Sequence, residues 1–504
     1  MGEPTTRRDG LSVAWLAGAL LGWIAFDNVL LAAFLGYSLP LVLIAALMST
    51  GGIAIMTART AATAQSPRIG WSTIGICLVL AAVLLILGGE GRWLYANPDW
   101  QVRDAVLADM GRNPWPFAYQ IDGMVTILRA PLGMYLKPAL IGGDSHTARD
   151  MALLVSNAAA LGGLLALGSA LFNTTRSRII ALFVFIAFSG LDAIGTWWAM
   201  SSGTPVSLDH IELWVDRSQY SSHLTMLFWV PQHAIAGWLC AITFLLWRTG
   251  RLSLGVFAAA IPLAALWSPL AVMGAIPFAI LAGVETLLKR SIRISDIMLA
   301  VGAVAISSLS LIFLKTDAEA VASHFTAMSL TQYAMVLTLE VLPLTAFALW
   351  HRRLIGYGNA VPVVVLLCLV LMPLYCIGTA IDFQMRASIM PLAILALSIA
   401  TLFERLDTNH GVTRAALLAL LLLGAITPLA EMRRAFVFLP APASACTLPE
   451  AWDAQTGNIV SKSTYLARLD ALPSWMRPSQ PAQVDGQHRK ACWHPHWATP
   501  RFDQ

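Results

Sequence analysis

An aspartate stands at the start of a predicted helix in a long polar segment of the sequence. Residues 95–100 read Tyr-Ala-Asn-Pro-Asp-Trp, in which Asn97 is a favoured N-cap and Pro98 a favoured first helical residue. The helix is expected to continue to about Met110. An acid at this position either complements the start of the helix or serves a function at the surface that the helix covers, so Asp99 is a candidate functional residue.

The direction of Asp99 bears on whether its role is chemical or structural. At about 100° per residue, Val102, Val106 and Met110 form one apolar stripe, with Asp99 in its middle and Arg103 at its edge. The helix would therefore turn Asp99 toward the membrane surface or the tops of a helix bundle. Alternatively, Asp99 is a first-turn acid that complements the helix dipole and pairs with Arg103.

Positively charged side chains are candidates for holding a phosphate or diphosphate. The planar fork of an arginine suits such an anion, and Arg217 and Arg386 stand in or beside predicted outer loops. Arg129 and Lys137 add positive charge near the membrane surface. The same cations could instead contact lipid headgroups.

Four ionisable residues fall inside apolar runs, where charge is costly and usually functional. Asp27, Asp192, His233 and Glu340 all lie roughly 10–15 Å below the same predicted surface, at about 1.5 Å per residue. A shared depth indicates a cavity that opens outward and continues into the loop 201–222.

That loop carries further polar residues. Asp209, His210 and Glu212, with Asp104, are expected to support catalysis or bind substrate together with Arg103, Asp192 and His233. His210, Glu212 and His223 could also ligate a divalent cation, but their spacing matches no characteristic ligand set. No metal ligand is therefore assigned.

Composition indicates the elements that position these residues. The 504-residue chain is 57% hydrophobic and 12% charged, whereas a soluble domain carries roughly 25% charged residues. Apolar runs long enough to span a bilayer recur along the chain. We predict an all-α polytopic membrane protein with about thirteen transmembrane helices, at 11–34, 38–57, 70–89, 150–172, 178–200, 223–247, 254–268, 270–288, 295–314, 333–350, 359–378, 388–403 and 413–430.

The positive-inside rule orients these runs. With a cytoplasmic N-terminus, every short loop on the cytoplasmic side is basic: Arg59 and Arg68; Arg176 and Arg178; Arg248 and Arg251; Lys289, Arg290 and Arg293; Arg352 and Arg353; Arg405 and Arg414. The opposite loops are longer or carry acids. An odd number of spans places the C-terminal tail outside.

Four segments follow from this layout. Residues 1–89 hold the N-terminal transmembrane helices, 90–149 an outer loop with amphipathic helices, 150–430 the transmembrane core and 431–504 a small outer tail. Cys446 and Cys492 are the two cysteines of that tail. On an oxidising face they are expected to form a disulfide, the alternative being two free thiols.

The long first outer loop, its early acid and the many spans resemble the GT-C superfamily of membrane glycosyltransferases, chiefly through residues 95–104. The resemblance implies sugar transfer from a polyprenyl-phosphate or polyprenyl-diphosphate donor to a glycan, lipid or protein acceptor, with Asp99 as the base. It also implies a non-cytoplasmic active site, which we expect at a bacterial inner membrane. The acidic loop follows the third span here, whereas it follows the first in many members.

Other classes remain open. A lipid-linked polysaccharide polymerase or ligase has a similar span count, but its main loop usually lies late in the chain. A transporter or flippase of lipid-linked glycans would account for buried acids and proline-broken spans such as 254–288. A scaffold subunit without chemistry is a further alternative. Nucleic-acid binding has no support, because no basic stripe with interleaved aromatic residues occurs.

Overall fold

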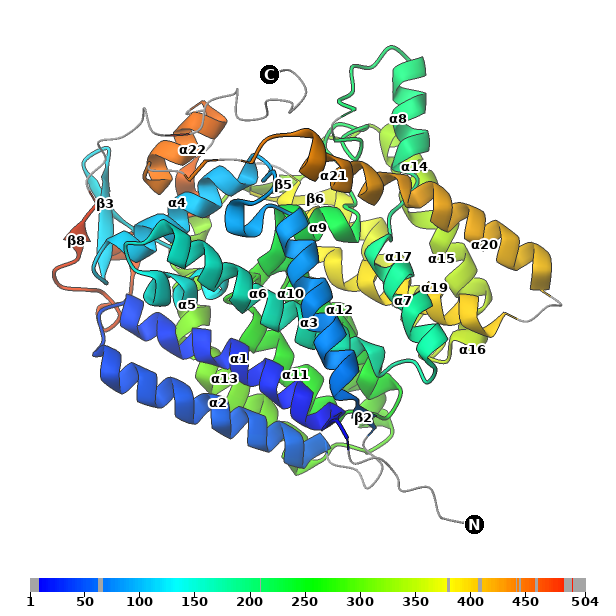
Figure 1. The fold of residues 1–504 in the computed structure, drawn as a ribbon, viewed down its shortest axis with the longest axis horizontal. Helices are drawn as coiled ribbons and strands as arrows, with labels where there is room; N and C mark the ends of the chain where they lie inside the picture. Colours follow the sequence, from blue (N-terminus) through cyan, green and yellow to red (C-terminus); the bar gives the residue numbers. More distant parts are fainter. Residues whose placement is uncertain are drawn as a thin grey trace.

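The computed structural model describes residues 9–61, 67–208, 210–378, 381–406, 410–440, 442–443, 446–457, 461–484 and 492. The chain is mostly helical (Figure 1). Its first helices are α1 (Val13–Phe34), α2 (Leu39–Ala61), α3 (Trp71–Leu87), α4 (Asp99–Arg112), α5 (Gly133–Gly142), α6 (His146–Ser169), α7 (Thr175–Ile186), α8 (Asp192–Ser201), α9 (His223–Trp229), α10 (Pro231–Arg248) and α11 (Leu254–Ala264). The others are α12 (Pro269–Leu288), α13 (Ile294–Lys315), α14 (Leu330–Val336), α15 (Leu342–Trp350), α16 (Arg352–Ile355), α17 (Val361–Leu371), α18 (Asp382–Ala387), α19 (Ile389–Arg405), α20 (Gly411–Gly424), α21 (Ile426–Val437) and α22 (Leu448–Thr456).

Short strands accompany the helices. They are β1 (Leu11–Ser12), β2 (Arg68–Ile69), β3 (Phe117–Ile121), β4 (Met124–Leu128), β5 (Ser323–Phe325), β6 (Tyr375–Ile377), β7 (Leu466–Arg468) and β8 (Ala482–Gln483). They form the pairs β1–β2 and β5–β6 and one four-stranded sheet in the order β7-β4-β3-β8. The fold is therefore helical with small sheets, whereas the sequence prediction contained helices alone.

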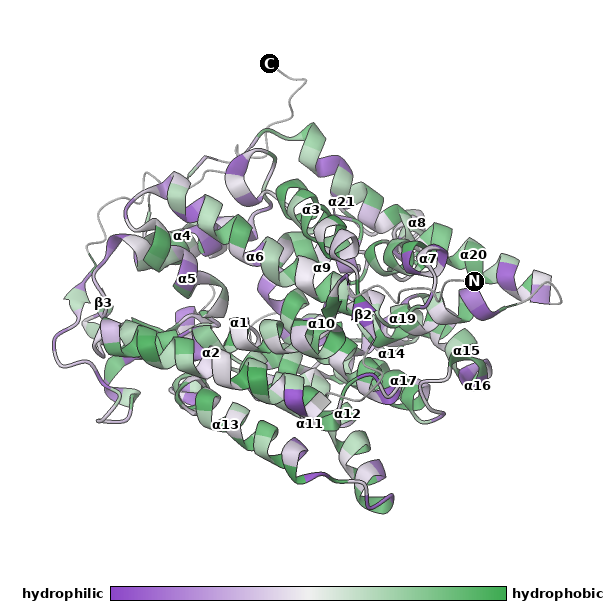
Figure 2. Cartoon of the chain, turned by 60° about the horizontal axis from the view of Figure 1, so that its bottom comes forward, coloured by the Kyte–Doolittle hydropathy of each residue, from purple (hydrophilic) through white to green (hydrophobic). Residues whose placement is uncertain are grey.

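Seven helical segments of the described chain are long and apolar enough to cross a membrane. They are Val13–Phe34, Leu39–Thr60, His146–Ser169, Pro269–Leu288, Ile294–Lys315, Leu330–Trp350 and Gly411–Val437. Figure 2 shows hydrophobic residues along α3 and α13 and hydrophilic residues on α4 and at the ends of several helices. This pattern is consistent with an integral membrane protein.

Several predicted apolar runs are divided into shorter helices. The run 178–200 forms α7 and α8, and the run 223–247 forms α9 and α10, with Pro231 as the first residue of α10. A π-helical turn, Leu337–Val341, separates α14 from α15. The last run extends beyond residue 430, because α21 ends at Val437.

The sequence Trp267-Ser268-Pro269 divides the run 254–288. Ser268 caps α12 by accepting a hydrogen bond from the N–H of Ala271, and Pro269 occupies the first helical position. Both features favour a helix start. The preceding helix α11 has 11 residues and is about 16 Å long at 1.5 Å per residue. It is too short to cross a hydrocarbon core of about 30 Å alone.

Helices α10 and α19 form the centre of the molecule. Helix α10 contacts α6, α9, α11, α12 and α19, and its residues from Pro231 to Leu246 are all buried. Helices α1 and α2 lie side by side with α13 against both of them (Figure 1). The central helices therefore present side chains to other helices on every face.

The segment 90–149 contains a β-hairpin between α4 and α5. Strands β3 and β4 pair in antiparallel register, with Tyr119 opposite Thr126. The turn Asp122-Gly123 has positive φ values of 49° and 80°, as two-residue hairpin loops require. The prediction of helices alone missed this hairpin, although Asp-Gly between two β-prone stretches is a strong local signal for it.

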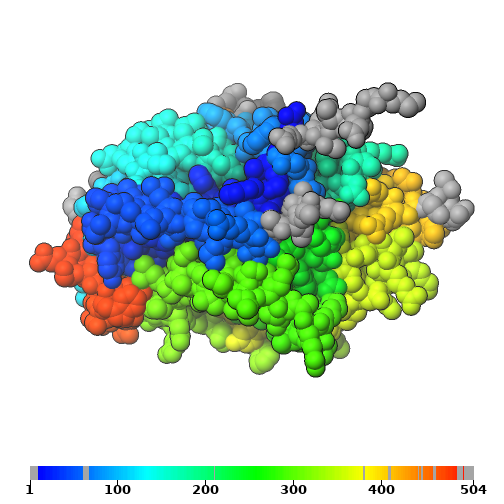
Figure 3. All heavy atoms as spheres, turned by 90° about the horizontal axis from the view of Figure 1, so that it is seen from below, coloured from blue at the N-terminus to red at the C-terminus, as the bar shows by residue number. Residues whose placement is uncertain are grey.

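The C-terminal residues complete the sheet begun by this hairpin. Strand β7 pairs antiparallel with β4, and β8 pairs parallel with β3. Cys446 and Cys492 form a disulfide, with their Cα atoms 5.2 Å apart. The tail also reaches the turn after α1, where the Tyr37 hydroxyl donates to the Trp475 carbonyl at 2.9 Å. Figure 3 shows these late residues beside the N-terminal helices. The segment 90–149 and the described residues of the tail thus form one layer.

Candidate functional site

A cavity of about 550 Å³ lies where the loop 90–149, the tail and the helix bundle meet. We call it the Asp99 cavity, after the residue at the start of α4 that lines it. Its charged and ionisable lining residues are Asp99, Arg103, Arg129, His233, Tyr375, Asp382, Arg386 and Tyr465. Five of these, Asp99, Arg103, Arg129, His233 and Arg386, are among the residues that the sequence suggested for the site.

Helix α4 places Asp99 and Arg103 on the cavity wall. Asn97 Oδ1 accepts a hydrogen bond from the N–H of Asp99 at 3.2 Å, and Asn97 Nδ2 donates to the Phe228 carbonyl at 2.8 Å. These bonds cap the helix and attach its start to α9. Arg103 Nη2 lies 2.9 Å from Asp99 Oδ2, with 2% of the arginine side chain exposed and 32% of the aspartate. The carboxylate is thus partly accessible and its partner is not.

The sequence left two surroundings open for the apolar face of α4, the membrane surface and the tops of the helix bundle, and the structure encloses this helix within the protein. Its residues from Trp100 to Met110 are all buried, and it packs against α5 and α22. Asp104 and Asp109, which point away from the Asp99 cavity, are therefore enclosed as well. Asp104 pairs with Arg92, and Asp109 accepts hydrogen bonds from the Tyr119 hydroxyl and the Leu448 N–H, both at 2.8 Å.

Strand β4 and the tail position Arg129. Arg129 directly follows β4, and its N–H donates to the Tyr465 carbonyl at 2.7 Å. Its Nη2 donates to the Ser463 carbonyl at 2.7 Å. Burial lowers the pKa of Arg129, an effect that Asp317 partly offsets. Arg129 forms no ion pair within the described chain, and its guanidinium bonds the neutral carbonyl of Ser463.

Two further basic groups come from the bundle. His233 lies in the first turn of α10, and its Nδ1 is buried without a hydrogen-bond partner among the described residues. Arg386 lies on α18, where it pairs with Asp382 one turn earlier. Gln384 of the same helix donates to the Ser218 hydroxyl at 2.9 Å, which ties α18 to the loop 201–222. The cavity therefore gathers residues that are far apart in the sequence.

Guanidinium groups in this cavity keep unused donors. Arg103 Nε and Nη1, Arg129 Nε and Arg386 Nε are buried with no hydrogen-bond partner among the described residues. Leaving a buried charged donor unpaired is costly. The three cations face two carboxylates, Asp99 and Asp382, so the local charge is positive. This arrangement can accept an anion with several oxygen atoms.

The tail supplies cavity residues that were not predicted from the sequence. Trp452 and Tyr465 pack together with ring centroids 5.3 Å apart, and both line the cavity. Gln455 Nε2 donates to Asp99 Oδ1 at 3.4 Å, and the buried Thr464 hydroxyl has no partner within the described chain. The sequence signal that could have indicated these residues is the concentration of tryptophan and tyrosine in a short polar tail.

One side of the cavity is apolar. Leu270 at the start of α12, Leu314 near the end of α13 and Val321 beyond it line this side, with Pro131 and Pro269. Helices α12 and α13 carry exposed apolar side chains such as Ile280 and Val301. The apolar wall of the cavity is thus formed by helices whose outer faces are apolar as well.

Asp104 and Lys137 were predicted as site residues but lie in separate buried ion pairs. Asp104 Oδ2 lies 2.9 Å from Arg92 Nη2. Burial raises the pKa of Asp104 to about 6, although Arg92 opposes the rise. Lys137 Nζ lies 2.8 Å from Asp27 Oδ2, to which the Trp267 indole also donates at 3.0 Å. Lys137 thus attaches α5 to α1 and does not line the Asp99 cavity.

The loop 201–222 belongs to a second polar cluster, which we call the His210 network: Asp192, His210, Glu212, Gln219, Glu340, Glu431 and Arg434. His210 Nδ1 lies 2.9 Å from Glu431 Oε1, and Gln219 Nε2 donates to Glu212 Oε2 at 2.7 Å. Arg434 Nη2 donates to the Tyr95 hydroxyl at 2.9 Å. Because Tyr95 precedes α4, the network supports the start of the site helix.

Burial, reinforced by Asp192, raises the pKa of Glu212 to about 7. Burial alone would lower the pKa of His210, but the hydrogen bond with Glu431 and the charge of Glu212 raise it above its ordinary value. The polar residues expected in one outward cavity are therefore divided. His233 reaches the Asp99 cavity, Asp192 and Glu340 join the His210 network, and Asp27 pairs with Lys137.

Arg217, a predicted phosphate ligand, lies away from the Asp99 cavity. Its side chain is 57% exposed and pairs with Asp216 at 3.3 Å. Asp209 lies outside the described residues. Within the described chain no group of three or more His, Cys, Asp or Glu side chains could hold a metal ion. His210, Glu212 and His223 therefore form no ligand set, because His223 Nδ1 bonds the Phe185 carbonyl instead.

Comparison with known proteins adds no assignment to this geometry. No protein-family model, no curated protein and no solved structure matches the chain.

Proposed function

We propose that the protein is a membrane glycosyltransferase. It would move a sugar from a polyprenyl-phosphate or polyprenyl-diphosphate donor to a glycan, lipid or protein acceptor in the Asp99 cavity. One observation carries this proposal: the cavity combines a partly exposed carboxylate with three arginines beside an apolar wall. These are the groups that the transfer of a sugar from a lipid phosphate requires.

The proposed reaction uses Asp99 as a general base. Its carboxylate takes the proton of an acceptor hydroxyl as that oxygen attacks the anomeric carbon. The bond between the anomeric carbon and the phosphate oxygen breaks, and its electron pair leaves with the lipid phosphate. Arg103, Arg129 and Arg386 stabilise the negative charge that develops on this leaving group. The apolar side at Leu270 and Leu314 accommodates the polyprenyl chain.

The proposal includes the orientation of the chain. About thirteen helices would cross a bacterial inner membrane, with the N-terminus in the cytoplasm and the Asp99 cavity and the tail outside. Seven long apolar helices and three shorter ones, Trp71–Leu87, Leu254–Ala264 and Val361–Leu374, support this. The basic loops support the direction.

Replacement of the base tests the reaction. Purified Asp99→Asn protein should lose transfer from a polyprenyl-linked sugar by about 10²–10⁴-fold, because the amide cannot accept the proton. Asp144→Asn, at an exposed aspartate of the same outer segment, is the matched control and should keep full activity. Unchanged transfer by Asp99→Asn would remove this residue from the mechanism.

A transporter of lipid-linked glycans is the second candidate, because two apolar segments are irregular. Helix α11 is short, and a π-helical turn carries Glu340 inside the segment Leu330–Trp350. Such broken helices occur at substrate sites of transporters. Reconstituted vesicles separate the candidates: translocation of a lipid-linked sugar without any new glycosidic bond would favour transport over transfer.

A further inference from the structure

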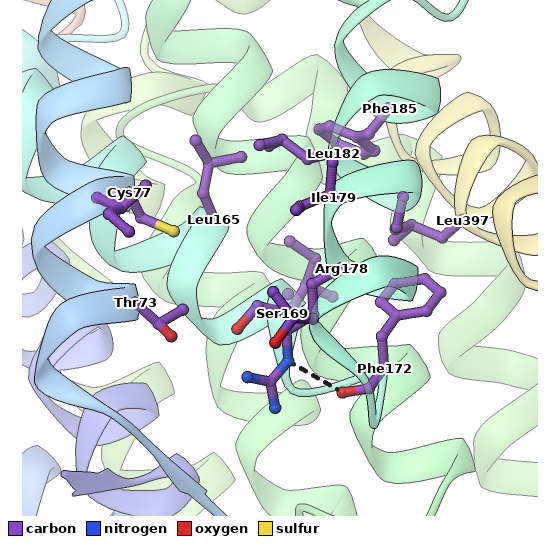
Figure 4. Close-up of a pocket in the computed structure, with 15 residues that line it drawn as sticks. Thr73, Cys77, Leu165, Ser169, Phe172, Arg178, Ile179, Leu182, Phe185 and Leu397 are labelled. Carbon is purple, nitrogen blue, oxygen red and sulfur yellow. Dashed lines mark hydrogen bonds between the residues drawn. The ribbon is translucent and has the colours of Figure 1, made fainter. Parts of the chain in front are cut away.

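A second cavity lies between α3, α6 and α7, far from Asp99 in the sequence and lined by a different set of residues. It has a volume of about 280 Å³. Figure 4 shows Leu165, Ile179, Leu182 and Phe185 around an open space, with Arg178 at one end. We call this space the Arg178 cavity. Its walls are almost entirely apolar, so water gains little by filling it.

The Arg178 cavity opens on a side of the molecule that carries exposed apolar side chains. Ile76 is 66% exposed and Ile179 50% exposed, and both line the opening. The cavity lies at the start of α3 and α7 and the end of α6, next to the basic loops at 67–70 and 173–178. A membrane lipid in that leaflet would therefore have direct access to it.

Arg178 supplies a positive charge at the end of this apolar space. Its Nε donates to the Phe172 carbonyl at 3.2 Å, which holds the guanidinium at the rim (Figure 4). No carboxylate pairs with Arg178 among the residues that the structure describes. Two polar side chains, Thr73 and Ser169, line the same end.

A second cation stands close to Arg178. Arg251 donates to the Ala170 carbonyl and, through Nη2, to Asn173 Oδ1 at 2.9 Å. Burial lowers the pKa of Arg251, Tyr357 opposes this, and the charge of Arg178 lowers it further. The two cations therefore repel each other, and a bound anion would relieve the repulsion.

We propose that the Arg178 cavity binds an anionic phospholipid of the adjacent leaflet, with its phosphate on Arg178 and part of one acyl chain in the apolar space. A volume near the lower end of ligand pockets, roughly 300–1,000 Å³, suits part of a chain and not a whole lipid. An acyl chain that leaves the bilayer for the cavity gains little from the hydrophobic effect, since both surroundings are apolar. Selectivity must therefore come from the headgroup charge.

This site is independent of the proposed glycosyl transfer, because none of its lining residues lines the Asp99 cavity. Native mass spectrometry of the full-length protein tests it, with phosphatidylglycerol and phosphatidylcholine of identical chains as the two probes. The wild type should retain phosphatidylglycerol at least several-fold more than phosphatidylcholine. Arg178→Gln should abolish that preference, and Arg178→Lys should restore part of it.

Matched variants exclude general surface charge and misfolding. Arg176→Gln removes a neighbouring exposed arginine that does not line the cavity, and it should leave the preference unchanged. Ala181→Leu adds bulk to the cavity wall without changing charge and should weaken retention of both lipids. Equal retention of the two lipids by the wild type would overturn the proposal, as would equal losses in Arg176→Gln and Arg178→Gln.

Discussion

The three arginines of the Asp99 cavity differ in what holds each of them. Arg103 is fully enclosed and pairs with Asp99, and Arg386 pairs with Asp382. The guanidinium of Arg129 bonds the Ser463 carbonyl and contacts no carboxylate within the described chain. A cation without a carboxylate has the most to gain from an incoming phosphate. Arg129 is therefore the residue whose removal should affect donor binding most directly.

Replacing Arg129 tests whether this residue contributes directly to donor binding. Arg129→Gln should raise the KM for a polyprenyl-phosphate sugar by about 10- to 150-fold, since a hydrogen bond to a charged group contributes about 1.5–3 kcal/mol. Arg129→Lys should recover part of the loss. Arg433→Gln, at an exposed arginine of α21, serves as the control in the same steady-state assay. A KM unchanged in Arg129→Gln would separate this residue from the donor.

Protonation of His210 should stabilise the protein. Because the pKa of His210 is raised above its ordinary value of 6.5, its contribution is complete below that value and is lost as the pH rises through the folded-state pKa. The groups around it are Glu212, Glu431 and Arg434. The midpoint of thermal unfolding of the wild type should decrease as the pH rises above about 6.5. It should fall less in His210→Gln, and parallel curves would contradict the assignment.

At the scale of elements, the β3–β4 hairpin positions Arg129, so its turn affects the site. Gly123 has φ +80°, and no heavy atom lies within 4 Å of the point that a Cβ would occupy. A side chain there would therefore meet backbone strain but no steric clash. Gly123→Ala should lower the free energy of unfolding of this layer by about 1–2 kcal/mol. Gly123→Asn should cost less, because asparagine tolerates positive φ.

Hydrogen exchange of the amides in β3 and β4 measures this loss locally. Faster exchange should appear in Gly123→Ala and extend to β7, which pairs with β4. Equal exchange rates in the wild type and Gly123→Ala would show that the turn does not limit the stability of the sheet.

The sequence predicted helices well where a local pattern exists. Asn97 and Pro98 placed the start of α4 to within a residue, and Ser268-Pro269 marked the start of α12. The break between α7 and α8 was missed. At this break a Cβ on Gly190 would meet the carboxylate of Glu340, and the Leu191 N–H donates to the Leu339 carbonyl at 3.3 Å. No local pattern encodes such a contact between distant helices.

At the scale of the whole molecule, the orientation of the chain can be measured. Single cysteines introduced into a cysteine-free background should react with a membrane-impermeant maleimide from one side only. Asp216→Cys in the loop 201–222 should be labelled from outside the cell, and Arg352→Cys only after the membrane is opened. Both residues belong to segments that the positive-inside rule assigns to opposite faces. Labelling of both from the same side would contradict the proposed layout.

Only some of the residues that line the Asp99 cavity could be predicted from the sequence, because the others reach it through contacts between distant parts of the chain. Asp99 and Arg386 were found by residue type and by their place near apolar runs. Tyr465 reaches the cavity because β7 joins the sheet of β3 and β4, and Gln455 because α22 packs on α4. Pairing between strands so distant in sequence depends on the completed fold. Lys137 was misplaced for the same reason, since its partner Asp27 lies on α1.

The place of these strands along the chain sets when the cavity can be completed. Strands β3 and β4 leave the ribosome long before β7 and β8, which flank them on both sides. Until β7 and β8 are made, the edges of the hairpin stay unpaired and the Asp99 cavity lacks the wall formed by Trp452 and Tyr465. The nascent chain would therefore insert its first helices before the cavity closes. In that interval the unpaired edges of β3 and β4 are exposed strand edges that a chaperone would need to cover.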